Sequence, residues 1–298
     1  MSLGLHTRRR LFSHTMTLLS GLAVVVILVP LVAVIYEAAV QGSSAFSWTF
    51  LTQRPPIACT PHLGVSCALG GVYTPFEGTL ILVGLASLVA IPIGIGAAIF
   101  TVEYAKERRI ARVISTTADV LSGLPSILAG VFVFSLMFQY DKPLVYSTIA
   151  GSLALSVLMI PIVVRTCEEA LRTVPESVRE AALALGIPRW KIATRIVLVA
   201  ALPGVVTGAM LSVARAAGES APILLTIGDG CFHPLQGVTQ QGCALALWIF
   251  IGATNNAYQN WDRLAWGAAL LLILIILAIS LTSRFSLNRL VRRMKGGP

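Results

Sequence analysis

Residues 172–202 read RTVPESVREAALALGIPRWKIATRIVLVAAL and form a charged, helix-prone stretch between long apolar segments. Pro175 suits the first turn of a helix, because a proline there gives up no hydrogen bond. Gly186 is a helix-stop signal, and Pro188 can open a new helix shortly after it. The stretch therefore predicts a short helix, a sharp corner and a second, basic helix.

The first of these helices is predicted to be amphipathic. Val178, Ala181, Ala182 and Leu185 recur with the spacing of one helix face, and the charged residues fall on other faces. A membrane protein with such a projecting helix is expected to have a partner that receives it. A solvated helical loop is the alternative that periodicity alone leaves open.

The composition identifies an integral membrane protein. The 298 residues are 56% apolar and 12% charged, with a mean hydropathy of +0.83, and a soluble domain carries about twice that charged fraction. Helices are expected because membrane barrels show a weaker, alternating pattern. The predicted fold class is therefore all-α and polytopic, and the net charge of +9 is a topology signal rather than a nucleic-acid signal.

Six apolar segments are long enough to cross a membrane as helices. They cover about 17–40, 76–101, 113–138, 144–164, 203–227 and 264–281. The first is not expected to be a cleavable signal peptide, because it is long enough to span and lacks a small-residue cleavage site. About six transmembrane helices are therefore predicted.

The remaining segments complete the expected organisation. Residues 1–16 are assigned to a basic leader and residues 285–298 to a basic tail. Two outer loops cover 41–75 and 228–263. The membrane core covers 76–284 and includes a charged inner segment at 168–200. Within the second outer loop, the apolar run 244–253 is too short to cross and is interpreted as interfacial or re-entrant.

The basic residues set the expected orientation. Six crossings place both termini on one side, and most of the 22 Lys and Arg residues fall on that side. Only Arg54, Lys142 and Arg263 fall on the opposite side, and Arg215 falls within a span. Because Lys and Arg are retained in the cytoplasm, the termini and segment 168–200 are predicted to be cytoplasmic.

The cysteines agree with this orientation. Cys59, Cys67, Cys231 and Cys243 fall on the predicted outer side, where disulfides persist, and Cys167 falls on the inner side. Of three possible pairings, Cys59 with Cys67 and Cys231 with Cys243 is the simplest. An outer metal site is the alternative, and the spacings of eight and twelve residues disfavour it.

Two charges interrupt the fifth apolar segment. This span is expected to start near Pro203, after a basic helix that follows the membrane surface until about Ala201, which places Arg215 near the midplane. Arg215 and Glu219 share a helix face, and charges at membrane depth are costly unless they are paired or face water. They are interpreted as lining a transport pathway, with Arg215 offering paired donors to an anion such as phosphate or sulfate. Alternatively, they neutralise each other and fix helix packing.

Arg165 ends the fourth span and is either a second cation on the anion path or an ordinary snorkelling arginine. Asp119 lies near the start of the third span. The Ser-Gly-Leu-Pro-Ser sequence that follows at 122–126 predicts a helix irregularity close to a pore.

No catalytic or metal-ligating residues are predicted. The sequence lacks a Gly-x-x-x-x-Gly-Lys-Ser/Thr phosphate loop, and its four histidines are scattered through termini and outer loops. This chain is therefore not expected to be an enzyme or to bind a cofactor. If ATP drives it, ATP and Mg²⁺ are expected on another chain.

The Glu180-Ala-Ala sequence, followed by Gly186 and Ile196, resembles the EAA loop of ABC-importer permeases. In that family the loop is a coupling helix that sits in a groove of a cytoplasmic ATPase. The family usually continues Ile-x-Leu-Pro, whereas this chain reads Ile-Val-Leu-Val and has its proline later, at Pro203. The missing proline affects the expected position of the bend after the coupling helix, but not the assignment of the loop.

Three segments resemble phosphate-specific ABC-importer permeases of the PstA type. They read PIVVRTCEE at 161–169, VPESVREAALALG at 174–186 and ARAAGESAP at 214–222. The resemblance runs from about residue 76 to the end and excludes loop 54–72 and the outer cysteine pairs. It implies the type I importer permease fold (MetI-like), with Arg165, Arg215 and Glu219 at the family's charged membrane positions.

The resemblance also implies partners and a location. These are a PstC-like second permease, two copies of a cytoplasmic ATPase, an extracytoplasmic phosphate-binding protein and the lipid of a bacterial inner membrane. ATP-driven closure of the ATPases is expected to push on 180–186 and open the pore alternately to each side. The alternatives are a sulfate or molybdate permease, or a non-transporting membrane scaffold for an ATPase. A membrane enzyme would need a nucleophile or metal cluster that the sequence does not show.

Overall fold

The structure, a computed structural model, describes residues 3–56, 70–105, 108–140, 142–228, 230–254 and 261–294. Every regular element among them is helical, which confirms the predicted all-α class. In chain order the elements are α1 (Leu3–Ser43), α2 (Trp48–Thr52), α3 (Tyr73–Ile99), the π-helix η2 (Phe100–Tyr104), α4 (Arg109–Ser122), α5 (Ser126–Tyr140), the 3-10 helix η3 (Lys142–Leu144), α6 (Thr148–Arg172), α7 (Glu176–Ala184), α8 (Arg189–Lys191), the π-helix η4 (Ile192–Val197), α9 (Leu198–Gly218), α10 (Ala221–Thr226), α11 (Leu245–Thr254) and α12 (Trp261–Met294).

Five helical runs in the described residues are long and apolar enough to cross a membrane, and a bent pair of helices provides a sixth. The five are Arg8–Ser43, Tyr73–Tyr104, Thr148–Arg172, Arg189–Gly218 and Trp261–Phe285. The predicted polytopic membrane fold is confirmed.

The third predicted span, 113–138, is broken rather than continuous. The run Arg109–Gly123 and α5 meet at 105°. Gly123 caps α4, where its N–H reaches the carbonyl of Asp119, and Pro125 disfavours a helical continuation through the residue before it. The Gly-Pro pair therefore produces the predicted irregularity as a complete change of direction.

The helix that contains the start of the fifth predicted span begins earlier than expected. Residues 189–218 form one helical run through α8, η4 and α9, instead of a surface helix that ends near Ala201. Pro203 lies inside α9, since spanning helices accept a proline where neighbouring helices cover the freed backbone. The run ends at Gly218, where Glu219 is extended.

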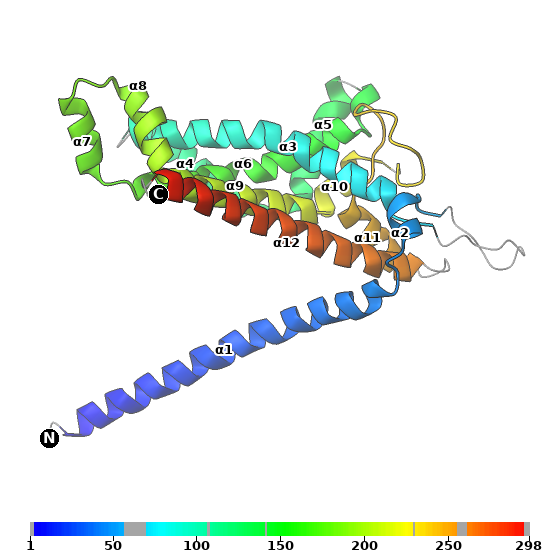
Figure 1. Ribbon diagram of the computed structural model, residues 1–298, viewed down its shortest axis with the longest axis horizontal. Helices are drawn as coiled ribbons and strands as arrows, with labels where there is room; N and C mark the ends of the chain where they lie inside the picture. Colours follow the sequence, from blue (N-terminus) through cyan, green and yellow to red (C-terminus); the bar gives the residue numbers. More distant parts are fainter. Residues whose placement is uncertain are drawn as a thin grey trace, which may run out of the picture.

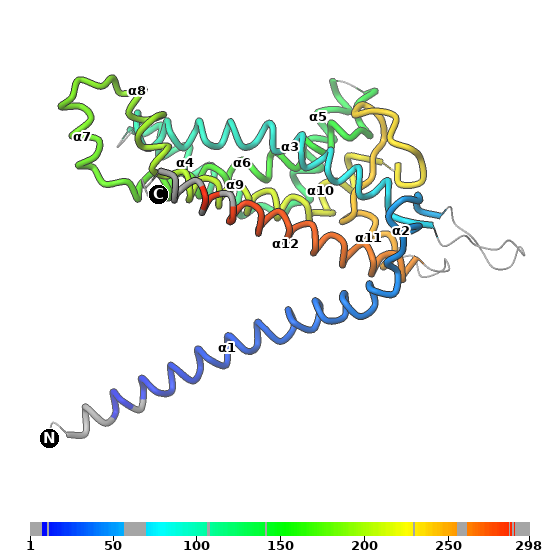
Figure 2. The backbone as a smooth tube through the Cα atoms, in the orientation of Figure 1, coloured from blue at the N-terminus to red at the C-terminus, as the bar shows by residue number. Residues whose placement is uncertain are grey.

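Within the bundle, α6 packs between α3 and α9 (Figures 1 and 2). Small residues allow their close approach: a Cβ on Gly204 would lie 2.6 Å from that of Ala170, and one on Gly208 would lie 2.1 Å from the Thr166 hydroxyl. Packing through small residues is typical of membrane helices. α1 points away from this bundle (Figure 1). The C-terminal end of α1 packs against the start of α12, where Gly42 faces the carbonyl of Trp266.

A disulfide closes the loop between α10 and α11 over the start of α6. It joins Cys231 to Cys243, the pairing predicted for this loop, whereas Cys59 and Cys67 lie outside the described residues. Within the closed loop, the carbonyl of Gln240 accepts the Thr148 N–H at 3.0 Å. The predicted short apolar run after the loop is α11, whose first four residues are buried.

We expect Gly78→Ala to destabilise the protein and Gly84→Ala, on the same helix, to leave it stable. A Cβ at Gly78 would lie 2.0 Å from the carbonyl oxygen of Cys243, whereas a Cβ at Gly84 meets nothing within 4 Å. Overpacking against backbone costs about 1–3 kcal/mol, and alanine at an open helix position gains about 0.5–1 kcal/mol. Thermal unfolding of both variants in detergent measures the difference, and equal midpoints would contradict the close packing of α3 on the loop.

Candidate functional site

The predicted corner after α7 is confirmed. Gly186 has a φ of 72°, in the left-handed region that glycine adopts without strain. Its N–H donates to the carbonyl of Leu183 at 2.9 Å, and the N–H of Ile187 donates to the carbonyl of Ala182 at 3.2 Å. These two bonds define a Schellman motif, and α8 begins directly after Pro188.

α7 projects from the bundle and keeps most of its apolar surface uncovered (Figure 1). Ala182 is its one buried residue, whereas Val178 is 37% exposed and Leu185 is 80% exposed. Glu180 and Ala181 are exposed as well. The face predicted to be apolar is thus free to meet another protein rather than packed within this chain.

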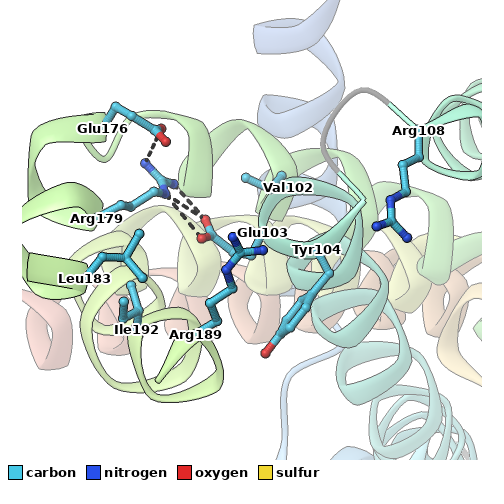
Figure 3. Close-up of a pocket in the computed structure, with 9 residues that line it drawn as sticks. All are labelled: Val102, Glu103, Tyr104, Arg108, Glu176, Arg179, Leu183, Arg189 and Ile192. Atoms are coloured by element: carbon cyan, nitrogen blue, oxygen red, sulfur yellow. Dashed lines mark hydrogen bonds and ion pairs between the residues drawn. The ribbon is translucent and has the colours of Figure 1, made fainter. Parts of the chain in front are cut away.

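A charged cluster attaches α7 to η2, at the C-terminal end of α3 (Figure 3). Arg179 donates to both carboxylate oxygens of Glu103: its Nη2 to Oε1 at 2.7 Å and its Nε to Oε2 at 3.2 Å. The side chains are only 12% and 10% exposed, respectively. The hydrogen bond to Glu103 raises the pKa of the Arg179 guanidinium, although burial lowers it.

Arg179 also caps the end of α6. Its Nη1 donates to the carbonyl of Val174 at 2.7 Å and its Nη2 to that of Leu171 at 3.0 Å. Leu171 lies in the last turn of α6, whose carbonyls lack intrahelical donors, and Val174 lies just after the helix ends. One guanidinium therefore holds together α7, the end of α6 and η2.

A hollow of about 320 Å³ opens beside this cluster, between η2 and the α7–α8 segment (Figure 3). It is lined by Val102, Glu103, Tyr104, Arg108, Glu176, Arg179, Leu183, Arg189 and Ile192.

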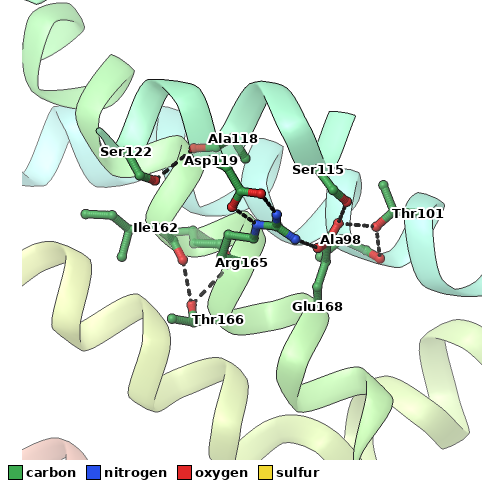
Figure 4. Close-up of polar contacts among 11 residues, drawn as sticks. Ala98, Thr101, Ser115, Ala118, Asp119, Ser122, Ile162, Arg165, Thr166 and Glu168 are labelled. Carbon is green, nitrogen blue, oxygen red and sulfur yellow. Dashed lines mark hydrogen bonds and ion pairs between the residues drawn. The ribbon is translucent and has the colours of Figure 1, made fainter. Parts of the chain in front are cut away.

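A second charged cluster surrounds Arg165 (Figure 4). Arg165 donates its Nε to Asp119 at 2.6 Å, and its Nη2 forms a second contact with the same carboxylate. Its Nη1 donates to Glu168 at 3.0 Å. Arg165 is 33% exposed and Asp119 is 58% exposed, so the arginine is held between two acids rather than extended freely toward an interface.

Glu168 is the most deeply buried member of this cluster, with 2% of its side chain exposed. Its Oε1 accepts hydrogen bonds from Thr101 at 2.7 Å and from Ser115 at 2.8 Å (Figure 4). The cluster thus joins η2, α4 and α6. Glu168, Thr101 and Ser115 are not among the predicted site residues. The i,i+3 spacing of Arg165 and Glu168 is a signal that the sequence contains. The contacts of Glu168 with Thr101 and Ser115 span 67 and 53 residues, and the sequence contains no signal for them.

Arg215 and Glu219 form a separate pair at the break between α9 and α10. The Nε of Arg215 lies 3.3 Å from a Glu219 oxygen, and the two side chains are 56% and 18% exposed. Glu219 follows the last helical residue, with φ −80° and ψ 121°. The pair predicted on one helix face therefore sits at a helix end.

The two arginines lie at different levels of the packed helices α6 and α9. Thr166, next to Arg165, faces Gly208, and Arg215 follows Gly208 by two turns, roughly 10 Å along the axis. Within the described ranges, no three His, Cys, Asp or Glu side chains gather where a metal ion could bind.

Residues 90–296 match the family of binding-protein-dependent transport system inner membrane components. Both charged clusters, the Arg215 pair and the α7 corner lie inside this range. The chain belongs to this family, as a PstA-type permease.

Its relatives and structural neighbours agree. The phosphate transport system permease protein PstA 1 of Mycobacterium tuberculosis is 38% identical to this permease over 276 residues, 93% of this chain and 87% of the relative. PstA of Yersinia pestis is 34% identical over 254 residues, 85% and 82% of the two chains. An inward-facing structure of the MetNI methionine ABC transporter has a TM-score of 0.58 at 21% identity, covering 74% of this chain and 95% of that one. The predicted MetI-like fold is confirmed.

In this permease, Glu168→Ala is expected to lower the free energy of unfolding by about 3 kcal/mol, because it removes the shared acceptor of Arg165, Thr101 and Ser115 and leaves a cavity at a buried position. The neighbouring Glu169 is exposed, and Glu169→Ala is expected to change stability by less than about 0.5 kcal/mol. Unfolding in mixed micelles of increasing SDS content measures both variants. A Glu168→Ala protein as stable as the Glu169→Ala protein would show that the cluster contributes nothing to the fold.

Proposed function

We propose that this permease conducts inorganic phosphate into the cell as one half of the pore of an ATP-driven importer. The observation that carries the proposal is the similarity to PstA phosphate permeases over 93% of the chain at 38% identity. The matching segment contains a solvent-accessible arginine, Arg215, at a break between two apolar helices.

Arg215 is proposed to receive the anion. Its guanidinium is 56% exposed and touches Glu219 through Nε, which leaves the two Nη groups as a planar pair of donors among the described contacts. Such a fork matches two oxygens of a phosphate. Glu219 then serves as the counter-charge that keeps binding weak enough for release.

Arg165 is proposed as the second cation on the path. Its exposed partner Asp119 can be exchanged for a passing anion, while the buried Glu168 keeps the guanidinium in place. The two arginines, roughly 10 Å apart along the helices, would offer successive stations between which a phosphate moves.

α7 is proposed to dock in a cytoplasmic ATPase. Its exposed apolar residues Val178 and Leu185, beside Glu180, form the expected contact surface. The complete importer would hold a PstC-like second permease, two ATPase copies that bind ATP and Mg²⁺, and an extracytoplasmic phosphate-binding protein. This chain would contribute no catalytic group, and its termini and α7 would face the cytoplasm of a bacterial cell.

In proteoliposomes that hold the complete transporter and internal ATP, Arg215→Gln is expected to reduce uptake of labelled phosphate at least tenfold. A hydrogen bond to a charged group contributes about 1.5–3 kcal/mol, and about 1.4 kcal/mol corresponds to a factor of ten. Arg10→Gln, at an exposed arginine on α1, is the matched control and should transport normally.

Three results would change the proposal. Uptake unaffected by Arg215→Gln would make Arg215 a packing charge. An intact transporter that hydrolyses ATP and imports sulfate or molybdate instead of phosphate would reassign the cargo. Hydrolysis without transport of any of these anions would favour a membrane scaffold.

A further inference from the structure

The two charged clusters of the inner half meet in one short element. Within η2, Thr101 donates to the buried carboxylate of Glu168, and Glu103 accepts the guanidinium of Arg179 (Figures 3 and 4). Thr101, which contacts the Arg165 cluster, and Glu103, which binds α7, are two positions apart in the sequence. The Arg165 cluster and the coupling helix are therefore joined through a single turn of backbone.

η2 is a π-turn at the end of α3. Its defining bond runs from the N–H of Ala105 to the carbonyl of Phe100, at 2.9 Å. Turns of this kind are rare and occur mostly at functional sites. Since α3 packs along α6, a displacement of η2 moves a helix that belongs to the centre of the bundle.

α7 contacts the bundle in two ways, through apolar packing and through the hydrogen bonds of Arg179. Ala182 is the one residue of α7 that is buried, and so small an apolar contact resists compression but offers little resistance to separation. Arg179 instead makes charge-assisted hydrogen bonds to Glu103 and holds two carbonyls of the α6 end. Directional bonds to an ionised partner resist separation as well.

We propose that Arg179 and Glu103 are positioning residues that transmit movement of α7, in both directions, through η2 to the Arg165 cluster. This inference rests on the proposed function, because it assumes that an ATPase moves α7. When α7 is drawn away, Glu103 pulls η2, Thr101 withdraws from Glu168, and Arg165 loses the support that fixes it. The state of the ATPases thereby sets whether Arg165 is available to the anion.

The first test compares phosphate imported per ATP hydrolysed in the reconstituted complete transporter. Arg179→Gln and Glu103→Gln are each expected to lower this ratio at least tenfold, while the ATPases still co-purify with the permease. The double variant should be no worse than either single one, since residues that act as a pair are not additive. Arg179→Lys should recover part of the ratio, because lysine keeps the charge but cannot form the two-pronged contact.

Arg189→Gln is the matched control. Arg189 lines the same hollow from α8 and is exposed, so its loss should leave the ratio unchanged. A ratio that stays at the wild-type value in Arg179→Gln would overturn the inference. A loss of transport that only follows the loss of co-purified ATPase would overturn it too, since Arg179 would then merely hold α7 for docking.

A second measurement separates this inference from the identity of the cargo. Cys167 lies beside Glu168 on α6 and is fully buried, so its alkylation rate, mapped by mass spectrometry, reports loosening of the cluster. ATP is expected to change this rate in the wild-type transporter and to leave it unchanged in Arg179→Gln. If phosphate uptake fails but this pattern holds, the phosphate assignment is wrong and the inference stands. No effect of ATP on the wild-type rate would overturn the inference.

Discussion

The burial of the Glu168 carboxylate constrains the part of the permease where α4, α6 and η2 meet. With 2% of its side chain exposed, an ionised carboxylate is stable only beside a counter-charge and with donors for its remaining lone pairs. Arg165 supplies the charge, and Thr101 and Ser115 supply the donors. Since these groups come from α6, η2 and α4, one buried side chain fixes the position of α6 relative to two consecutive elements whose contacting residues lie 67 and 53 positions before Glu168 in the chain.

The same requirement accounts for the arrangement outside the bundle. Glu103 is 10% exposed and needs a cation, which α7 supplies as Arg179. The guanidinium also donates to the carbonyl of Leu171, in the last turn of α6, and to that of Val174 just after it. α7 is therefore held largely by polar bonds, and most of its apolar surface stays uncovered. A helix fixed in this way can present that surface to a partner without losing its place on the permease.

Features set by local chemistry could be predicted from the sequence, and features set by long-range contacts could not. Gly186 and Pro188 specify the α7 corner because each has its own backbone preference, and apolar length specifies the spans. The change of direction at 123–125 was predicted only as an irregularity, since a Gly-Pro pair does not determine an angle. The cluster around Glu168 depends on contacts 53 and 67 residues apart. No periodicity records such contacts, so Arg165 could equally be interpreted as a snorkelling side chain.

Arg165 and Arg215 differ in their charged neighbours. This difference indicates what must lie against the surface of α9. Arg165 has two acidic partners, whereas Arg215 is 56% exposed and has one contact with Glu219. Contact between such an exposed guanidinium and lipid is energetically costly, because charges within a membrane must be paired or hydrated. The face of α9 that carries Arg215 must therefore meet water or another protein chain. In the proposed importer, a pore between this permease and a second one would satisfy that condition, because it would give Arg215 water and the anion a route past it.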